Sequence, residues 1–174
     1  MPSNFSAAYA IAFCAGLYFP FGFGAMVAFS TLLATDMAIN LFVYHLSAFN
    51  WFTIPNYLAY AAILFLGRKF RPQMGFFSLM FGGLLGAVLF YLITNTGAWL
   101  QNPRYPKNFT GWVQALSTGL PEFPQTWEFF RNTMISGGLF TGLFVGGVKL
   151  GEKARDEESE SPEEETSSGE EAQA

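Results

Sequence analysis

The sequence predicts an all-α fold: a polytopic transmembrane helix bundle of about five spans, followed by a disordered acidic C-terminal tail. Hydrophobic residues make up 51% of the 174 positions and charged residues only 13%, about half the charged share of an ordinary soluble protein. The apolar runs are continuous and do not alternate with a period of two, so helices are favoured over a membrane β-barrel.

Five apolar segments are long enough to cross a bilayer, or nearly so, within a membrane domain of residues 1–151. A helix needs about 20 residues to cross the hydrocarbon core, so the first and third segments are short unless their flanks are included. The five predicted spans are residues 5–19, 24–45, 56–70, 75–100 and 127–150.

The acidic balance of the whole chain comes from its last residues. Residues 152–174 hold ten acids and two bases, a net charge of −8, whereas the whole chain has −4, so residues 1–151 carry +4. This segment has no aromatic residue and no aliphatic residue larger than alanine. We expect it to be disordered, because it cannot bury enough apolar surface to offset its ordering entropy.

The basic residues predict an orientation. One group lies between the third and fourth spans and another follows the fifth, and both groups should be cytoplasmic. The N-terminus and the loops 46–55 and 101–126 then lie outside, and the C-terminus inside. The basic groups are Arg68, Lys69 and Arg71, and Lys149, Lys153 and Arg155; the four tryptophans, Trp51, Trp99, Trp112 and Trp127, all fall near the outer face.

A layer of polar residues at membrane depth is the best functional indication. Asp36 lies inside the second apolar run, one helical turn from Asn40, and acids at this depth usually face a cavity or a polar partner. Counted at about 1.5 Å per residue from the outer ends, polar residues of separate spans share one outer layer. The candidate ligand-binding residues are Asp36, Asn40, Tyr91, Asn95, Trp99, Arg131 and Asn132, with Asn4 and Ser6 at the outer end of the first span.

Two interpretations of this layer stay open. The first is a cavity open to the outside, with Asp36 at its floor. The second is structural: Asp36 and Arg131 pair with each other, and the asparagines bond across helices.

Small residues recur every fourth position on three spans, which allows helix backbones to approach closely. The pattern fits packing inside one subunit or a docking face for another membrane protein, and the first span is the candidate docking face. The stripes are Ala8, Ala12 and Gly16; Gly82 and Gly86; and Gly138, Gly142 and Gly146.

The loop 101–126 contains a helix-like spacing of Phe109, Trp112, Val113 and Leu116. We expect a short helix at the outer interface, acting either as a lid over the cavity or only as an anchor.

Catalytic and cofactor motifs are absent from the sequence. It has no nucleophile-elbow, zincin or phosphate-loop motif, and Cys14 and His45 are each the single residue of its type. The prediction is therefore a protein that is not an enzyme and has no metal or cofactor.

Several stretches resemble a known family: NFSAAYAIAFCAG (4–16), LLATDMAIN (32–40), NYLAYAAILFLGRKF (56–70), LFYLITNTGAWL (89–100), YPKNFTGW (105–112) and FFRNTMISGGLFTGLFVG (129–146). They resemble an uncharacterised bacterial family of small polytopic membrane proteins labelled as transport proteins. That family is similar in layout to the substrate-binding S components of energy-coupling-factor transporters. The resemblance covers nearly all of residues 4–150.

The resemblance implies an outward-facing pocket for a small metabolite and a first helix that docks, through Ala8 and Ala12, on a transmembrane coupling subunit with ATPases. Three differences stand out. Relatives carry another helix before Asn4, often have proline where Ala7 stands, and often have an acid where Gly138 stands.

The sequence thus predicts an inner-membrane, small-molecule-binding transport component. The alternative is a structural or assembly subunit of a larger membrane complex.

Overall fold

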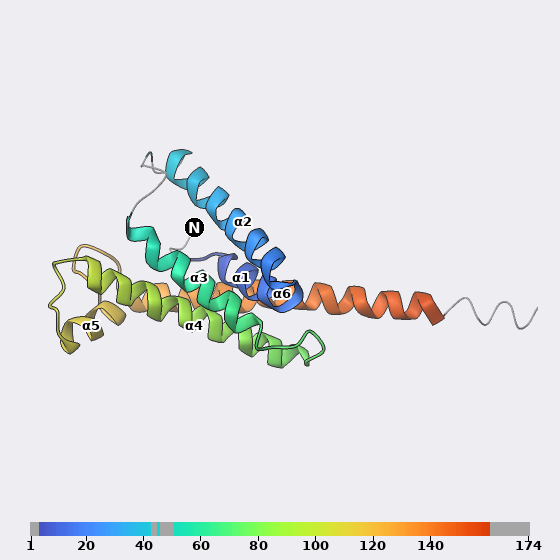
Figure 1. The fold of residues 1–174 in the computed structure, drawn as a ribbon. Coiled ribbons are helices and arrows are strands. Elements are labelled where there is room, and N and C mark those ends of the chain that lie inside the picture. The colour runs from blue at the N-terminus through green and yellow to red at the C-terminus, as the bar shows by residue number, and fades with distance from the viewer. Residues whose placement is uncertain (1–3, 43–44, 46–50, 161–174) are drawn as a thin grey trace, which may run out of the picture.

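The computed structural model describes residues 4–42, 45 and 51–160, and this part of the chain is helical, without strands. Helix α4 packs against both α3 and α6, and α5 lies at one end of the bundle (Figure 1). The elements are α1 (Ala8–Tyr18), α2 (Phe21–Phe42), the 3-10 turn η1 (Trp51–Thr53), α3 (Ile54–Gly67), α4 (Phe76–Gln101), α5 (Phe109–Leu116) and α6 (Thr126–Glu160). The predicted all-α class is confirmed.

Among the described residues, three helices are long and apolar enough to cross a membrane: α2, α4 and α6. The helices of the first and third predicted spans are shorter, with 11 residues in α1 and 14 in α3. They therefore extend about 16 Å and about 21 Å, less than the roughly 30 Å hydrocarbon core. The length of α1 has a direct consequence for the site described below.

Helices α1 and α3 pack backbone against backbone. A Cβ atom added at Gly16 would lie 2.1 Å from the carbonyl oxygen of Leu64, and one added at Gly67 would lie 2.3 Å from that of Phe13. Any side chain at either position would collide with the main chain of the other helix. Glycine at both positions is therefore what permits this crossing.

The predicted docking stripe lies inside the subunit. Ala8 and Ala12 are 7% and 0% exposed, and Gly16 is buried against α3. In this structure the packing interpretation describes the stripe, and the three residues are not an exposed docking face. Small residues at this spacing serve either purpose, so their sequence pattern could not decide between them.

Helices α4 and α6 also meet through glycines. A Cβ atom at Gly83 would lie 2.3 Å from the Thr141 hydroxyl, and one at Gly137 would lie 2.8 Å from the Cβ of Ala87. The stripe singled out on the fifth span, Gly138, Gly142 and Gly146, lies one position further round and contacts Leu84, Met80 and Phe76 less tightly. The closest approach therefore uses neighbouring positions of the same glycine-rich segments.

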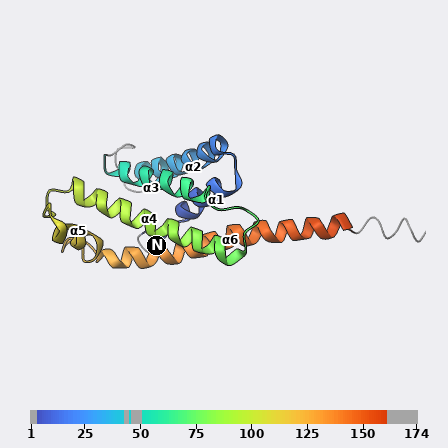
Figure 2. The same cartoon turned by 60° about the horizontal axis from the view of Figure 1, so that its bottom comes forward.

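Helix α2 leaves the bundle at an angle. Figure 1 shows it diverging from α3 along its length, and in Figure 2, after rotation, the two helices overlap. Its buried residues are Gly24, Ala28 and Leu32, all within its first twelve residues. At its beginning, the guanidinium of Arg68 lies 5.6 Å from the centre of the Phe21 ring. Helix α2 is thus attached at one end and largely exposed elsewhere.

The tail prediction is wrong for residues 152–160, which continue α6 as helix. This stretch projects beyond the rest of the molecule in both views (Figures 1 and 2). Extending an existing helix costs little, and the segment contains good helix formers and a Lys153–Glu157 pair at helical spacing. Its low hydrophobicity excludes burial but not helix formation. The remaining predicted tail, 161–174, lies outside the described residues.

The two predicted cytoplasmic basic groups lie at the same end of the bundle. The Lys149 ammonium donates to the carbonyl oxygen of Pro72 at 3.4 Å, which brings the end of the fifth predicted span beside the loop that carries Arg68, Lys69 and Arg71. We call this the basic end. The opposite end, which carries α5, is the loop end.

Candidate functional site

The short first helix leaves space inside the bundle on the side of the loop end. The Tyr9 ring, in the first turn of α1, contacts the Phe90 ring at 4.6 Å. Phe90 lies eleven residues before the end of α4, so α1 begins about 16 Å below that end. Residues 4–7, which precede α1, are not helical and include Asn4, with a φ of 60°. Non-helical backbone at membrane depth occurs where it is buried in protein or lines a cavity.

A polar cavity of about 340 Å³ occupies this space. Five of its lining residues have amide or aliphatic hydroxyl side chains, and the other four are aromatic. They come from the segment before α1, from α1 itself, and from α3, α4 and α6. The lining residues are Asn4, Ser6, Tyr9, Asn56, Tyr60, Phe90, Thr94, Asn95 and Phe129.

Hydrogen bonds order one side of this lining. The Tyr9 hydroxyl donates to the carbonyl oxygen of Asn4 at 2.8 Å, and the Ser6 hydroxyl accepts from the backbone N–H of Ala8 at 3.1 Å. The Asn95 amide donates to the carbonyl oxygen of Tyr91 at 2.8 Å. These bonds hold the side chains in place and leave acceptor oxygens, including Oδ1 of Asn95, for another molecule.

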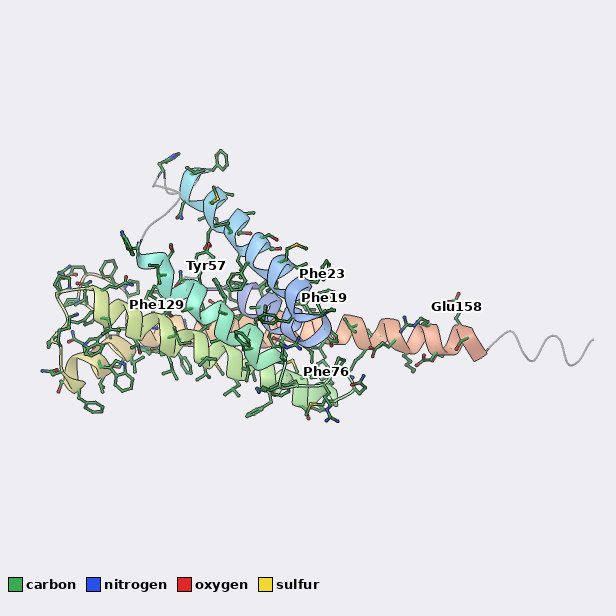
Figure 3. The ribbon with its side chains drawn as sticks, viewed as in Figure 1. Phe19, Phe23, Tyr57, Phe76, Phe129 and Glu158 are labelled. Carbon is green, nitrogen blue, oxygen red and sulfur yellow. The ribbon has the colours of Figure 1, made fainter. Side chains whose placement is uncertain are left out.

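Asp36 approaches the cavity from α2 but does not line it. The Tyr57 hydroxyl donates to Oδ2 of Asp36 at 3.0 Å, and the Tyr57 ring meets the Tyr60 ring edge-on at 6.2 Å. Tyr60 in turn lines the cavity. Figure 3 labels Tyr57 on α3, on the side where α2 diverges, and Phe129 further towards α5. Asp36 therefore supports the cavity wall through two tyrosines.

The pairing of Asp36 with Arg131, part of the structural interpretation of the polar layer, is absent from the structure. The Arg131 side chain is exposed and lies 5.3 Å from the centre of the Trp127 ring. Each of the two charges thus has a different partner. Depth alone could not reveal this, because two residues at one depth face each other only if the helix faces match.

The remaining predicted site residues do not line the cavity. Some of them lie on helix surfaces, and others contact the loop 101–126. Asn40 is half-buried on α2, one turn beyond Asp36. Asn132 is half-buried on α6, and its carbonyl oxygen accepts a bond from the Ser136 hydroxyl at 2.8 Å. The cavity lining thus includes Asn95 from the predicted set, together with Asn4 and Ser6 from the predicted polar layer.

Tyr91 and Trp99 of α4 bind the loop 101–126 through hydrogen bonds. The Tyr91 hydroxyl donates to the carbonyl oxygen of Leu116, at the end of α5. The Trp99 indole donates to the carbonyl oxygen of Pro106 at 2.8 Å. A third bond runs from the Trp112 indole to the Thr96 hydroxyl at 2.9 Å.

The predicted short helix is confirmed as α5, whose N-terminus is capped by the Asn108 side chain accepting from the N–H of Gly111. It packs on α4 and α6. A second cavity, of about 210 Å³, lies beneath the same loop and shares Asn95 and Phe129 with the first. The loop is therefore anchored to α4 and covers a chamber next to the polar cavity.

Two other hollows contrast with the polar cavity. One, of about 390 Å³, lies between α1, α2 and α6, and the other, of about 490 Å³, lies along α3 and α4. Both are lined mainly by apolar side chains. Such surfaces suit lipid chains, whereas the amide-rich lining of the first cavity does not.

Sequence reasoning missed the lining residues of α3. Asn56 follows Pro55 in the first turn of that helix and is the first residue of the third predicted span. Its signal was an amide at the outer end of a short span, the criterion that identified Asn4 and Ser6. Tyr60 and Phe90 gave no separate signal, because aromatic residues occur throughout the chain.

Within the described residues, 4–42, 45 and 51–160, there is no group of three or more His, Cys, Asp and Glu side chains that could hold a metal ion.

A protein-family model matches residues 1–159, and its description is "Family of unknown function (DUF6580)". No curated protein and no solved structure matches the chain.

Proposed function

Since the chain belongs to the family DUF6580, whose function is unknown, we propose from its own geometry that it is a small-molecule-binding component of a membrane transport system. The polar cavity is its binding site. The observation that carries this proposal is the convergence of amide and hydroxyl side chains from four segments of an apolar chain on one space of about 340 Å³.

The cost of these polar groups supports the proposal. Polar side chains inside a bilayer are expensive and usually mark a pathway or site. Packing alone would favour filling the space above α1 with apolar side chains. The cavity volume also lies in the range of about 300–1,000 Å³ that is usual for small-molecule sites.

The topology we propose has five spans. The flanks of α1 and α3 would complete their crossing: residues 4–7 before α1, and residues 51–53 and 68–70 around α3. The basic end would face the cytoplasm, following the positive-inside rule, and the cavity would open towards the outside. In a bacterium this is the inner membrane, with the N-terminus outside and the C-terminus inside.

A binding component without nucleotide motifs needs an energy source elsewhere. By analogy with the S components, this would be a transmembrane coupling subunit with ATPases. Because Ala8, Ala12 and Gly16 are packed within the bundle, any such docking would have to use another surface.

The test is thermal stabilisation of the purified protein by a small-molecule extract of the producing cells. We expect the extract to raise the melting temperature of the wild type and to have a weaker effect on Asn95→Leu, which removes a lining acceptor. Gln73→Leu is the matched control, because Gln73 is an exposed amide near the basic end. An extract that leaves the wild type unchanged, or equal shifts for both variants, would overturn the proposal.

The second candidate function is a structural or assembly subunit. The observation that favours it is the largely exposed surface of α2, where Met26 and Phe42 are 59% and 78% exposed. Purification in a mild detergent followed by mass spectrometry separates the two candidates. A stoichiometric complex without an ATPase would favour assembly, and one with a coupling module and ATPases would favour transport.

A further inference from the structure

The charge of the cavity lining restricts what can bind there. Its nine residues include no Lys, Arg, His, Asp or Glu. The polar atoms are those of three asparagines, one serine, one threonine and two tyrosines. The lining is therefore polar but formally neutral.

Two charged side chains of the predicted site are directed elsewhere. The Asp36 carboxylate accepts from Tyr57, outside the lining. The Arg131 guanidinium lies over the Trp127 ring on the exposed face of α6. A charged ligand in the cavity would thus have no counter-charge among the lining side chains.

The free energy of removing a ligand from water distinguishes charged from neutral ligands. Moving a charge out of water without a partner is strongly unfavourable, even after the protein relaxes. A neutral polar group loses much less, and amides and hydroxyls can replace its hydrogen bonds with water. At membrane depth this difference favours neutral ligands strongly.

The hydrogen-bond pattern adds a second restriction. Thr94 and Asn95 each already donate to a backbone carbonyl oxygen, so their side-chain oxygens remain as acceptors. These acceptors suit a ligand that presents O–H or N–H groups. The Tyr60 and Phe90 rings, stacked at 5.3 Å with an interplanar angle of 27°, supply an apolar wall beside them.

We propose that the cavity binds an uncharged small molecule that donates hydrogen bonds from O–H or N–H groups and has an apolar or flat face, as nucleosides and sugars do. This inference rests on the proposed function and specifies its substrate class.

The test separates the cell extract by charge. Anion-exchange and cation-exchange resins divide it into a neutral, an anionic and a cationic fraction, and each fraction is added to the purified protein in a thermal-shift assay. We expect only the neutral fraction to raise the melting temperature. Asn95→Leu and Asn56→Leu should each require about tenfold more of this fraction for the same shift, because each removes one hydrogen-bond partner. Gln73→Leu should behave as the wild type.

The outcomes are distinguishable. Stabilisation by the anionic or the cationic fraction, with no effect of the neutral one, would overturn the inference and leave the proposed binding function standing. No stabilisation by any fraction would overturn both. Stabilisation by the neutral fraction that both lining variants retain would place the ligand outside this cavity and would also overturn the inference.

Discussion

The basic end and the loop end of the bundle differ in what fills the space between the helices. Towards the basic end, α1 and α3 touch through Gly16 and Gly67, so close that no side chain fits between them. Towards the loop end, the same helices border a space of about 340 Å³ lined by amides, hydroxyls and rings. The comparison shows that the length of α1 sets where dry packing stops and polar space begins.

Substitution of Gly16 by alanine is the strongest way to break the packed end. The new Cβ would lie 2.1 Å from the Leu64 carbonyl oxygen, and a backbone atom cannot move aside as a flexible side chain can. We expect Gly16→Ala to lower the free energy of unfolding by about 3 kcal/mol. Denaturant unfolding in detergent measures this, with Gly22→Ala as control, because a Cβ there meets nothing within 4 Å. Equal stability of the two variants would show that the helices can separate at no cost.

The contact between α4 and α6 gives a second, smaller test. Gly83→Ala would collide with the branched side chain of Thr141, which has little rotamer freedom. We expect a loss of about 2 kcal/mol.

The double variant Gly83→Ala/Thr141→Gly moves the side chain from one helix to the other. It should recover about 1 kcal/mol of the loss predicted for Gly83→Ala in a double-mutant cycle. Strict additivity of the two changes would contradict the contact.

A third test concerns the hydrogen bond that attaches α2 to α3 near the polar cavity. Tyr57→Phe removes the donor to Asp36 and should weaken the attachment of α2 by about 1 kcal/mol. Faster hydrogen–deuterium exchange in α2, with unchanged exchange in α4, is the expected result. Thr35→Val is the control, since the Thr35 hydroxyl bonds only within its own helix, to the carbonyl oxygen of Thr31. If this control accelerated exchange as much as Tyr57→Phe, the hydrogen bond would not be the cause.

The smallest expected effect concerns pH and the loop itself. Burial, and secondarily the nearby Glu122 carboxylate, raise the pKa of Tyr105. Below the ordinary tyrosine pKa of about 10, the phenol is neutral in both the folded and the unfolded loop. Above it, the unfolded loop loses its proton first, so stability should fall as pH rises.

Melting temperatures between about pH 8 and about pH 11 measure this effect. Tyr105→Phe should flatten the fall, and Glu122→Gln should reduce it by less than about 1 kcal/mol, since Glu122 is partly exposed and paired with Arg104. An identical pH profile for wild type and Tyr105→Phe would refute the assignment.

The sequence by itself determined the helical class, the apolar segments and the short helix α5. Each of these depends on local composition: continuous apolar runs, basic clusters and the spacing of Phe109, Trp112 and Leu116. It also identified Asn95 and the Asn4–Ser6 stretch as polar groups at one depth, because depth follows from counting residues along a helix.

Which faces of the helices pack against each other follows from the tertiary structure and not from the sequence pattern. In the folded chain Ala8, Ala12 and Gly16 are buried inside the bundle. Asp36 accepts a hydrogen bond from Tyr57, and the Arg131 guanidinium lies over the Trp127 ring. Asn56 and Asn95 line the same cavity. The physical reason is that depth along a helix follows from residue count, whereas the rotation of one helix against another depends on side chains and glycines of both helices at once.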